Sequence, residues 1–214
     1  MTDDLRFDVP LYTVAETARL LDMDAGTLRR WTKRDGLVHA LEPRTPRAPS
    51  LPFIAVAETQ FYRQLRREGL SFQAITAGMK AVRNELSDQM LVRGRLAHDG
   101  TNILMNMPDE GETSGWTVAR NMQGGIPGVI ERCLWPITWA EDDLPQRVRL
   151  TAYEGADIII DPRFAFGQPI VARRGVRADD IFEMFKAGDS METVSAEFRV
   201  EPAVIEAIVR FRAA

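Results

Sequence analysis

Basic side chains gather near the amino-terminal end of this chain of 214 residues, where they could bind a polyanion. Between Asp24 and Arg83 there are 11 Lys and Arg residues against 5 Asp and Glu, a local net charge of +6. The other residues hold 16 basic and 26 acidic groups, a net charge of −10. Guanidinium and ammonium groups bind phosphate oxygens through charge and hydrogen bonds. The distribution of charge therefore favours a phosphate-rich ligand for one segment and disfavours it for the rest.

Three adjacent carboxylates in the run AEDDL (140–144) are a second candidate for chemistry. Glu141, Asp142 and Asp143 carry the oxygen ligands that Mg²⁺ prefers, and a hydrolase could use them. Adjacent carboxylates in a loop are, however, more typical of a solvated surface. The sequence contains no Ser/His/Asp set and no CxxC or HExxH pattern. We therefore expect no catalytic residue, no metal and no cofactor, with a carboxylate-dependent hydrolase as the alternative.

Glycine, cysteine and histidine positions disfavour other kinds of site. The run QGGIPGVI (123–130) lacks the lysine and Ser/Thr of a phosphate-binding loop, and we interpret it as a plain turn between strands. The single Cys133 excludes a disulfide framework and suits a reducing cytosol. His39 and His98 are far apart, and with one cysteine they cannot form an ordinary zinc site.

No part of the sequence suggests a membrane or secretory segment. No apolar run approaches the roughly 20 residues that a membrane span needs. The first ten residues, MTDDLRFDVP, are acidic and lack the basic-then-apolar order of a signal peptide. With 45% hydrophobic residues the chain has ample material for a core. We expect a cytoplasmic protein that does not contact a membrane.

Two short helices joined by a turn are expected to position the basic residues between Tyr12 and Lys33. Thr13 and Glu16 have the spacing of a capping box at the first helix. The turn LDM (21–23) is followed by Asp24 as a second helix cap, and Leu28 and Trp31 then share a buried face. This order is typical of a helix-turn-helix, in which the second helix enters the major groove of DNA.

A proline-rich segment follows this helix pair. Four prolines between Gly36 and Pro52 exclude a helix or a central strand, so we predict a wing or extended loop. Helices near 55–68 and after Ser71 complete the expected domain. Cations anchor phosphates, whereas the first turns of the second helix reach base edges. The expected phosphate contacts are Arg30, Lys33, Arg34, Arg44 and Arg47, and the expected base contacts are Thr27 and Arg29.

The pattern changes in the second half of the chain. The runs NILMNM (102–107), RVRLTAY (147–153) and DIIID (157–161) are β-prone and predict short strands. From about 177 the pattern is helical, and the segment 192–211 again has the rhythm of a helix-turn-helix. Residues 178–214 carry 4 basic and 8 acidic groups, which works against DNA. We expect this second pair of helices to pack against protein, mostly as core.

The stretch YTVAETARLLDMDAGTLRRWTKRDGLV (12–38) resembles the helix-turn-helix of MerR-type regulators, and FYRQLRREGLSFQAI (61–75) resembles their next helix pair. The long C-terminal coiled coil of those regulators is missing. Residues 158–211 resemble the domain-of-unknown-function family 433, through Asp161-Pro162, Gly167-Gln168-Pro169 and the final helix pair.

The two modules together resemble VapB-type antitoxins. The resemblance implies a repressor and antitoxin in one chain, with a PIN-domain ribonuclease toxin and operator DNA as partners. Arg173 and Arg174 could pair with the acidic metal site of such a nuclease, with Arg212 as a second candidate. A solvated pair of loop arginines is the alternative reading.

We therefore expect an α+β protein, mostly α, with a winged helix-turn-helix domain at 1–90 and a region at 91–214 for contact with protein. In the latter, short strands lead to a helical module at about 157–214. Recognition of two half-sites predicts a homodimer. The alternative is a stand-alone regulator whose central region senses a small molecule, with Trp116, Trp135 and Trp139 as walls of its pocket.

Overall fold

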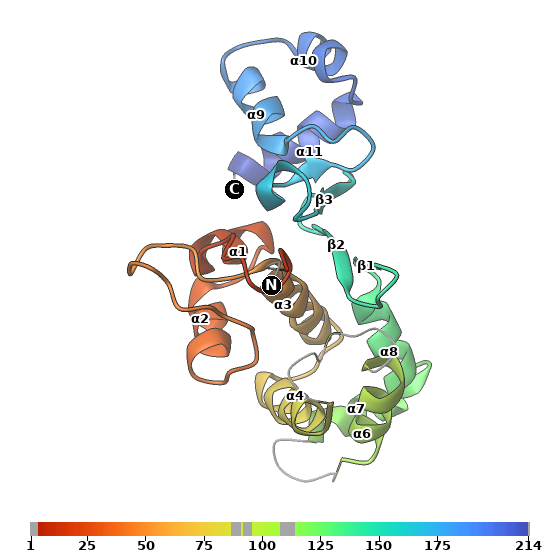
Figure 1. Ribbon diagram of the computed structural model, residues 1–214. Helices are drawn as coiled ribbons and strands as arrows, with labels where there is room; N and C mark the ends of the chain where they lie inside the picture. Colours follow the sequence, from red (N-terminus) through yellow and green to blue (C-terminus); the bar gives the residue numbers. More distant parts are fainter. Residues whose placement is uncertain (1–3, 87–90, 92–95, 108–113, 214) are drawn as a thin grey trace.

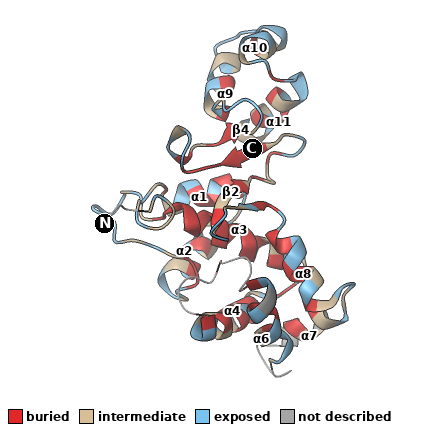
Figure 2. Ribbon diagram, turned by 45° about the vertical axis from the view of Figure 1, so that its right-hand side comes forward, coloured by how far each residue is buried: buried red, intermediate tan, exposed pale blue. Residues whose placement is uncertain are grey.

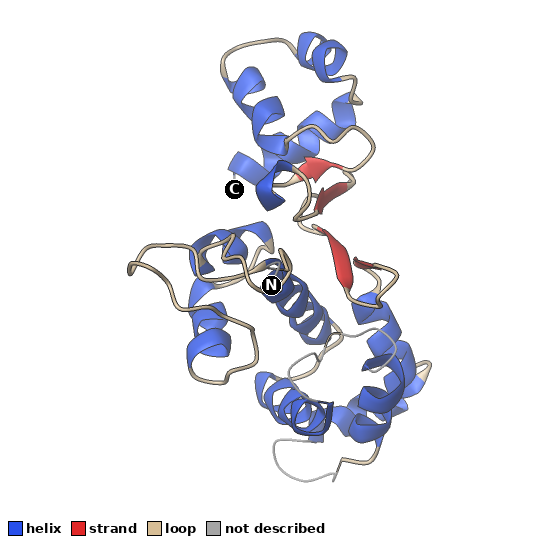
Figure 3. Ribbon diagram, in the orientation of Figure 1, coloured by secondary structure: helices blue, strands red, loops and turns tan. Residues whose placement is uncertain are grey.

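The computed structural model describes residues 4–86, 91, 96–107 and 114–213, and the domain boundary expected near residue 90 lies beside the gaps. Figure 1 shows α3 near the centre of the molecule, with a group of helices at one end and the C-terminal helices at the other. Helices dominate, and the strands form one small sheet between the two ends (Figure 3). The expected class, α+β and mostly α, is confirmed.

The helix-turn-helix forms as its caps predict. Helix α1 spans Val14–Leu20 and begins with the complete capping box of Thr13 and Glu16. Helix α2 spans Ala25–Lys33, and the Asp24 side chain accepts a hydrogen bond from the backbone N–H of Thr27. Leu28 and Trp31 are buried, which turns the other side of α2 outward.

The proline-rich segment contains neither helix nor regular strand, as predicted. Its two ends meet because the backbone N–H of Leu41 donates to Ser50 O at 2.8 Å. An isolated bridge between Tyr12 and Leu51 ties the segment to the start of α1. The loop therefore projects from the base of the helix-turn-helix, at the place expected for a wing.

Helix α3, Phe53–Arg67, is the central element of the fold. Every residue from Phe53 to Arg63 is buried, and Figure 2 shows the buried colour along the helix. A helix that is covered all round lies within a core and not on its surface. The polar Glu58 on α3 is satisfied, since it accepts a hydrogen bond from the backbone N–H of His39 at 2.6 Å.

The hydrophobic core continues past the expected boundary near residue 90. Helix α4, Phe72–Leu86, buries an apolar stripe that includes Ile75, Met79 and Val82. The indole N–H of Trp116 donates to Ala74 O on this helix at 2.7 Å. A Cβ on Gly78 would lie 2.5 Å from the Trp116 ring, so only glycine fits there. The elements that follow α4 are η1 (Leu96–Gly100), α6 (Thr101–Met105), α7 (Ser114–Asn121) and α8 (Gly125–Leu134).

Two predictions for this region are wrong. The run NILMNM is helical as far as Met105, because α6 packs against α4 and α8 and not into a sheet. The glycine-rich run 123–130 is not a turn between strands. It joins α7 to α8, with Gly124 at φ 81° as the helix cap, and it then becomes the first turns of α8. In both cases packing against neighbouring helices overrides local propensity.

The sheet is antiparallel with the order β1-β2-β3-β4, and its strands are Ile137–Trp139, Pro145–Arg149, Ile158–Ile160 and Ile170–Val171. The predicted strand in DIIID is confirmed, and all three residues of β3 are buried. The run RVRLTAY is extended only in its first part, because the chain turns from Thr151 onwards.

The C-terminal module consists of α9 (Ala178–Lys186), α10 (Met191–Phe198) and α11 (Pro202–Ala213). Ser190 caps α10 and Pro202 begins α11, so the segment is helical as the sequence predicts. Residues 158–213 are joined to the earlier part of the chain by the pairing of β2 with β3, and further by a hydrogen bond and a ring contact. The Tyr12 hydroxyl donates to Gly167 O at 2.7 Å, and the rings of Tyr153 and Phe211 lie 4.0 Å apart.

Candidate nucleic-acid interface

A groove of about 940 Å³ lies between α2 and the proline-rich loop. Arg29 and Lys33 line one side, since residues four apart share a face of a helix. Arg47 lines the other side from the loop, and Thr13 stands at the start of α1. The structure thus brings together three of the predicted contacts from two separate segments. All three basic side chains are exposed.

The other predicted residues lie outside this groove. The Thr27 hydroxyl donates to Asp24 Oδ1 at 3.0 Å, so it helps to cap α2 and is less available to a base. The Arg30 guanidinium lies 5.0 Å from the centre of the Phe72 ring. This cation–π contact holds the exposed Arg30 side chain against the start of α4. Arg34 and Arg44 are exposed at the end of α2 and in the loop.

Three arginines of α3, which sequence reasoning did not select, flank the opposite side of α2. Arg63, Arg66 and Arg67 line a pocket of about 380 Å³ together with Thr27. Burial lowers the pKa of Arg63, and the neighbouring Arg67 acts in the same direction. The basic run RQLRR (63–67) could have indicated a positively charged surface on this helix. The helical periodicity of the segment, however, predicts only its buried apolar face.

The candidate residues of the C-terminal module differ in their surroundings. Arg173 and Arg174 are exposed in the turn between β4 and α9 and form no ion pair within the described residues. Arg212 is engaged within its own module. Its guanidinium lies 3.2 Å from Asp179 Oδ1 and 5.2 Å from the centre of the Phe182 ring.

One carboxylate of the acidic run 140–144 forms an ion pair, and Cys133 is buried. Asp142 pairs with Arg6 at 2.7 Å, and these hydrogen bonds lower the pKa of the carboxyl group. Within the described ranges, no three His, Cys, Asp or Glu side chains are grouped to hold a metal ion. Burial raises the pKa of Cys133 to about 12, which keeps it a neutral thiol near pH 7.

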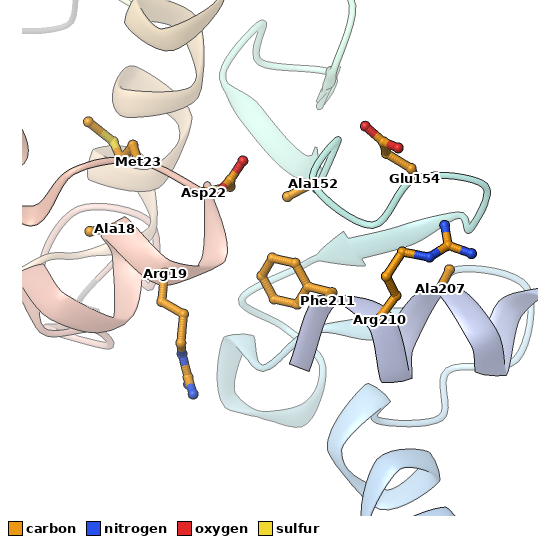
Figure 4. Close-up of a pocket in the computed structure, with 9 residues that line it drawn as sticks. All are labelled: Ala18, Arg19, Asp22, Met23, Ala152, Glu154, Ala207, Arg210 and Phe211. Carbon is orange, nitrogen blue, oxygen red and sulfur yellow. The ribbon is translucent and has the colours of Figure 1, made fainter. Parts of the chain in front are cut away.

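Two of the tryptophans expected as pocket walls differ in their exposure. Trp116 is fully buried, whereas Trp135 is 66% exposed. A different pocket, of about 390 Å³, lies between the helix-turn-helix and the C-terminal module. Figure 4 shows Arg19, Asp22, Glu154 and Arg210 around it, with Phe211 at the end of α11. In the described part of the chain no helix is long and apolar enough to cross a membrane.

Comparisons with known proteins match both ends of the chain. Residues 10–79 match a family described as "Putative DNA-binding HTH domain", and residues 158–211 match "Protein of unknown function (DUF433)". The crystal structure of Rv2018 from Mycobacterium tuberculosis superposes with a TM-score of 0.81 at 27% identity. That match covers 96% of this chain and all of the other.

One curated relative extends over both modules. The chain is 30% identical to "Putative antitoxin VapB45" of Mycobacterium tuberculosis strain H37Rv over 222 aligned positions, which cover 93% of this chain and 92% of the relative. A match of this length includes the helix-turn-helix, the central helices and the C-terminal module in the same order. The chain therefore belongs to the VapB45 family of antitoxins, with a DNA-binding helix-turn-helix at its front and a DUF433 module at its back.

Proposed function

We propose that this protein neutralises a PIN-domain ribonuclease toxin and represses the operon that encodes both proteins. The observation that carries the proposal is the groove between α2 and the loop, where Arg29, Lys33 and Arg47 face a common space. The VapB45 relative, whose name describes an antitoxin, supports the same reading.

The DNA-binding part of the proposal assigns α2 to the major groove. Arg29 would then approach a base edge, while Lys33 and Arg47 would contact phosphates and set the position of the helix. Arg34 and Arg44 are exposed beyond the groove, where they could extend contact along the backbone. We further propose that the protein acts as a homodimer in which each copy reads one half-site.

The toxin-binding part assigns the partner to the C-terminal module. Its 8 acidic against 4 basic residues between 178 and 214 repel DNA. The turn at 172–175, just before this acidic segment, presents Arg173 and Arg174 to solvent, free of ion pairs among the described residues. Guanidinium groups pair well with carboxylates, and the metal site of a PIN nuclease is rich in them.

Reciprocal double variants test both parts. The product of the neighbouring gene, if it is a PIN-domain ribonuclease, is co-expressed and assayed for RNA cleavage with and without this protein. We expect Arg173→Ala/Arg174→Ala to weaken inhibition at least tenfold and to leave affinity for operator DNA unchanged. Arg44→Ala/Arg47→Ala should weaken affinity for operator DNA and leave inhibition of the nuclease unchanged. The second variant is a matched control, since it also removes two exposed loop arginines.

Several outcomes would count against the proposal. Inhibition that is unaffected by Arg173→Ala/Arg174→Ala would remove these residues from the toxin interface. A failure of the wild-type protein to inhibit or co-purify with the nuclease would remove the antitoxin function itself. Failure to bind the DNA upstream of its own gene would remove the repressor function.

The pocket in Figure 4 favours one alternative, a regulator that senses a small molecule. Two basic and two acidic side chains line the pocket together with Phe211, Met23 and three alanines, a mixture of polar and apolar groups found in many ligand sites. Such a protein would bind operator DNA with an affinity that a metabolite changes. Arg210→Ala, in this pocket, would abolish that change, whereas an antitoxin would show no such dependence.

A further inference from the structure

Three large apolar side chains form an exposed patch near the junction of the two modules. Phe166 is 88% exposed, Phe164 51% and Leu5 45%. The Arg163 guanidinium lies 5.7 Å from the Phe164 ring, and Arg163 lines a pocket together with Leu5. Leu5 and Phe164 thus both lie near Arg163, and Phe166 follows Phe164 by two residues; we call these three exposed residues the phenylalanine patch. Only two other large apolar residues of the described chain are this exposed, Met105 and Trp135.

The loop that carries the patch is held in an unfavourable conformation. Ala165 and Phe166 have φ angles of 49° and 52°, which residues with a Cβ rarely adopt. The loop is fixed on both sides. Gly167 O accepts the Tyr12 hydroxyl, and buried Asp161 accepts hydrogen bonds from Arg163 at 2.8 and 3.0 Å. Strain that the surroundings maintain is characteristic of binding and switch sites. Here it keeps Phe166 pointing into solvent.

A pocket of suitable size lies beside the patch. It measures about 290 Å³ and is lined by Leu5, Arg6, Ala140, Gln146, Pro162 and Arg163, with Asp4 at its edge. Pro162 and Arg163 immediately precede Phe164 in the chain, and Phe166 follows two residues later, so both exposed rings lie within a few residues of the pocket. A surface with both a projection and a pocket can pair with itself across a two-fold axis.

The charges around the patch are also self-complementary. Arg147 and Arg163 are 40% and 48% exposed and share the single carboxylate of Asp161, which leaves excess positive charge. The β1–β2 hairpin contributes Ala140 and Gln146 to the pocket, and its tip carries exposed Glu141 and Asp143. A two-fold axis would place the acidic tip of each copy near the arginines of the other, which favours this orientation over others.

We propose that the occupant of this surface is a second copy of the chain, with Phe166 of each copy inserted into the pocket of the other. The inference rests on the proposed function, because reading two half-sites requires a dimer. The longest described helices, α3 and α4, have 15 residues each and bury their apolar faces within the core. No helix of the described residues is thus available for a dimerising coiled coil. An aromatic anchor in a pocket is the usual centre of binding energy at an interface.

Sedimentation equilibrium of the full-length protein tests the proposal. We expect a wild-type dimer at micromolar concentration. Phe166→Ala should remove the projection and raise the dimer dissociation constant at least tenfold. Gln146→Trp should fill the pocket from a strand position and have the same effect. Met105→Ala is the matched control, because this side chain is 48% exposed and lies on α6, and it should leave the mass unchanged. Thermal unfolding of each variant establishes that it is folded.

A monomeric wild-type protein, or a dimer that both variants leave intact, would overturn the inference. Loss of toxin binding in Phe166→Ala with an unchanged dimer would assign the patch to the toxin instead. Operator binding separates this inference from the proposed function. A wild-type protein that binds operator DNA and inhibits the toxin, with a dimer insensitive to Phe166→Ala, retains the function and loses only the interface.

Discussion

Asp161 shows how a single buried carboxylate organises the junction between the sheet and the patch. It is fully buried and is bonded by Arg147 and Arg163, both of which are partly exposed. Burial alone would raise the pKa of this carboxyl group. The hydrogen bonds from Arg163 and Arg147 outweigh that effect, and the pKa lies below its ordinary value of 3.8. The ionised form therefore stabilises the folded state.

The lowered pKa of Asp161 predicts a pH-dependent contribution to stability. A carboxyl group with a lowered folded pKa contributes fully above its unfolded pKa of about 3.9, and the contribution is lost as pH falls through the folded value. We expect Asp161→Asn to reduce the free energy of unfolding by about 2 kcal/mol at pH 7. Below about pH 4 the difference between variant and wild type should shrink. Urea denaturation at pH 7 and at pH 3 measures both quantities, and a difference independent of pH would refute the assignment.

Helix α2 and the proline-rich loop opposite it form one groove, which requires both segments. The sequence predicted the caps of α2 and its buried face from local spacing, and the structure confirms them. It could not show that Arg47 stands across a groove from Lys33, because the proline-rich loop has no periodicity that sets its direction. Nor could it show that Arg63, Arg66 and Arg67 of α3 flank the other side.

This arrangement predicts how salt weakens DNA binding. Each phosphate contact releases about 0.9 of a counterion, so removal of one contact lowers the slope of log affinity against log salt by about 1. We expect Lys33→Ala and Arg47→Ala each to lower the slope by that amount, equally for operator and unrelated DNA. Fluorescence anisotropy between 50 and 300 mM salt measures the slope. Arg173→Ala serves as the control, and an equal change in that variant would show a general charge effect.

At the scale of the whole molecule, α3 ties the front of the chain to its centre. It packs against α8 and β2 as well as α4, and Arg63 donates to the Thr151 hydroxyl at 3.0 Å. A fragment of residues 1–90 would expose these faces of a helix that is buried all round. The domains expected at 1–90 and 91–214 were inferred from a change in pattern, which carries no information on packing.

We therefore expect the fragment 1–90 to be poorly folded in isolation. Exposure of several apolar side chains at about 1.5–3 kcal/mol each exceeds the margin of a small domain. A longer fragment, 1–156, retains the central helices and the β1–β2 hairpin and should unfold cooperatively. Circular dichroism during heating distinguishes the two. A cooperative transition of fragment 1–90, at the temperature of the full chain, would instead support two independent domains.

The sequence by itself determined the features that depend on neighbours along the chain. These are the capped helices at both ends, the absence of regular structure in the proline-rich loop, the buried strand of isoleucines and the separation of charge. The tertiary structure alone decided that most of NILMNM is helical, that the glycine-rich run begins α8, and that Phe166 is exposed to solvent. Caps and turns use hydrogen bonds between residues a few positions apart, whereas these other features depend on packing between segments far apart in sequence, which local propensity does not encode.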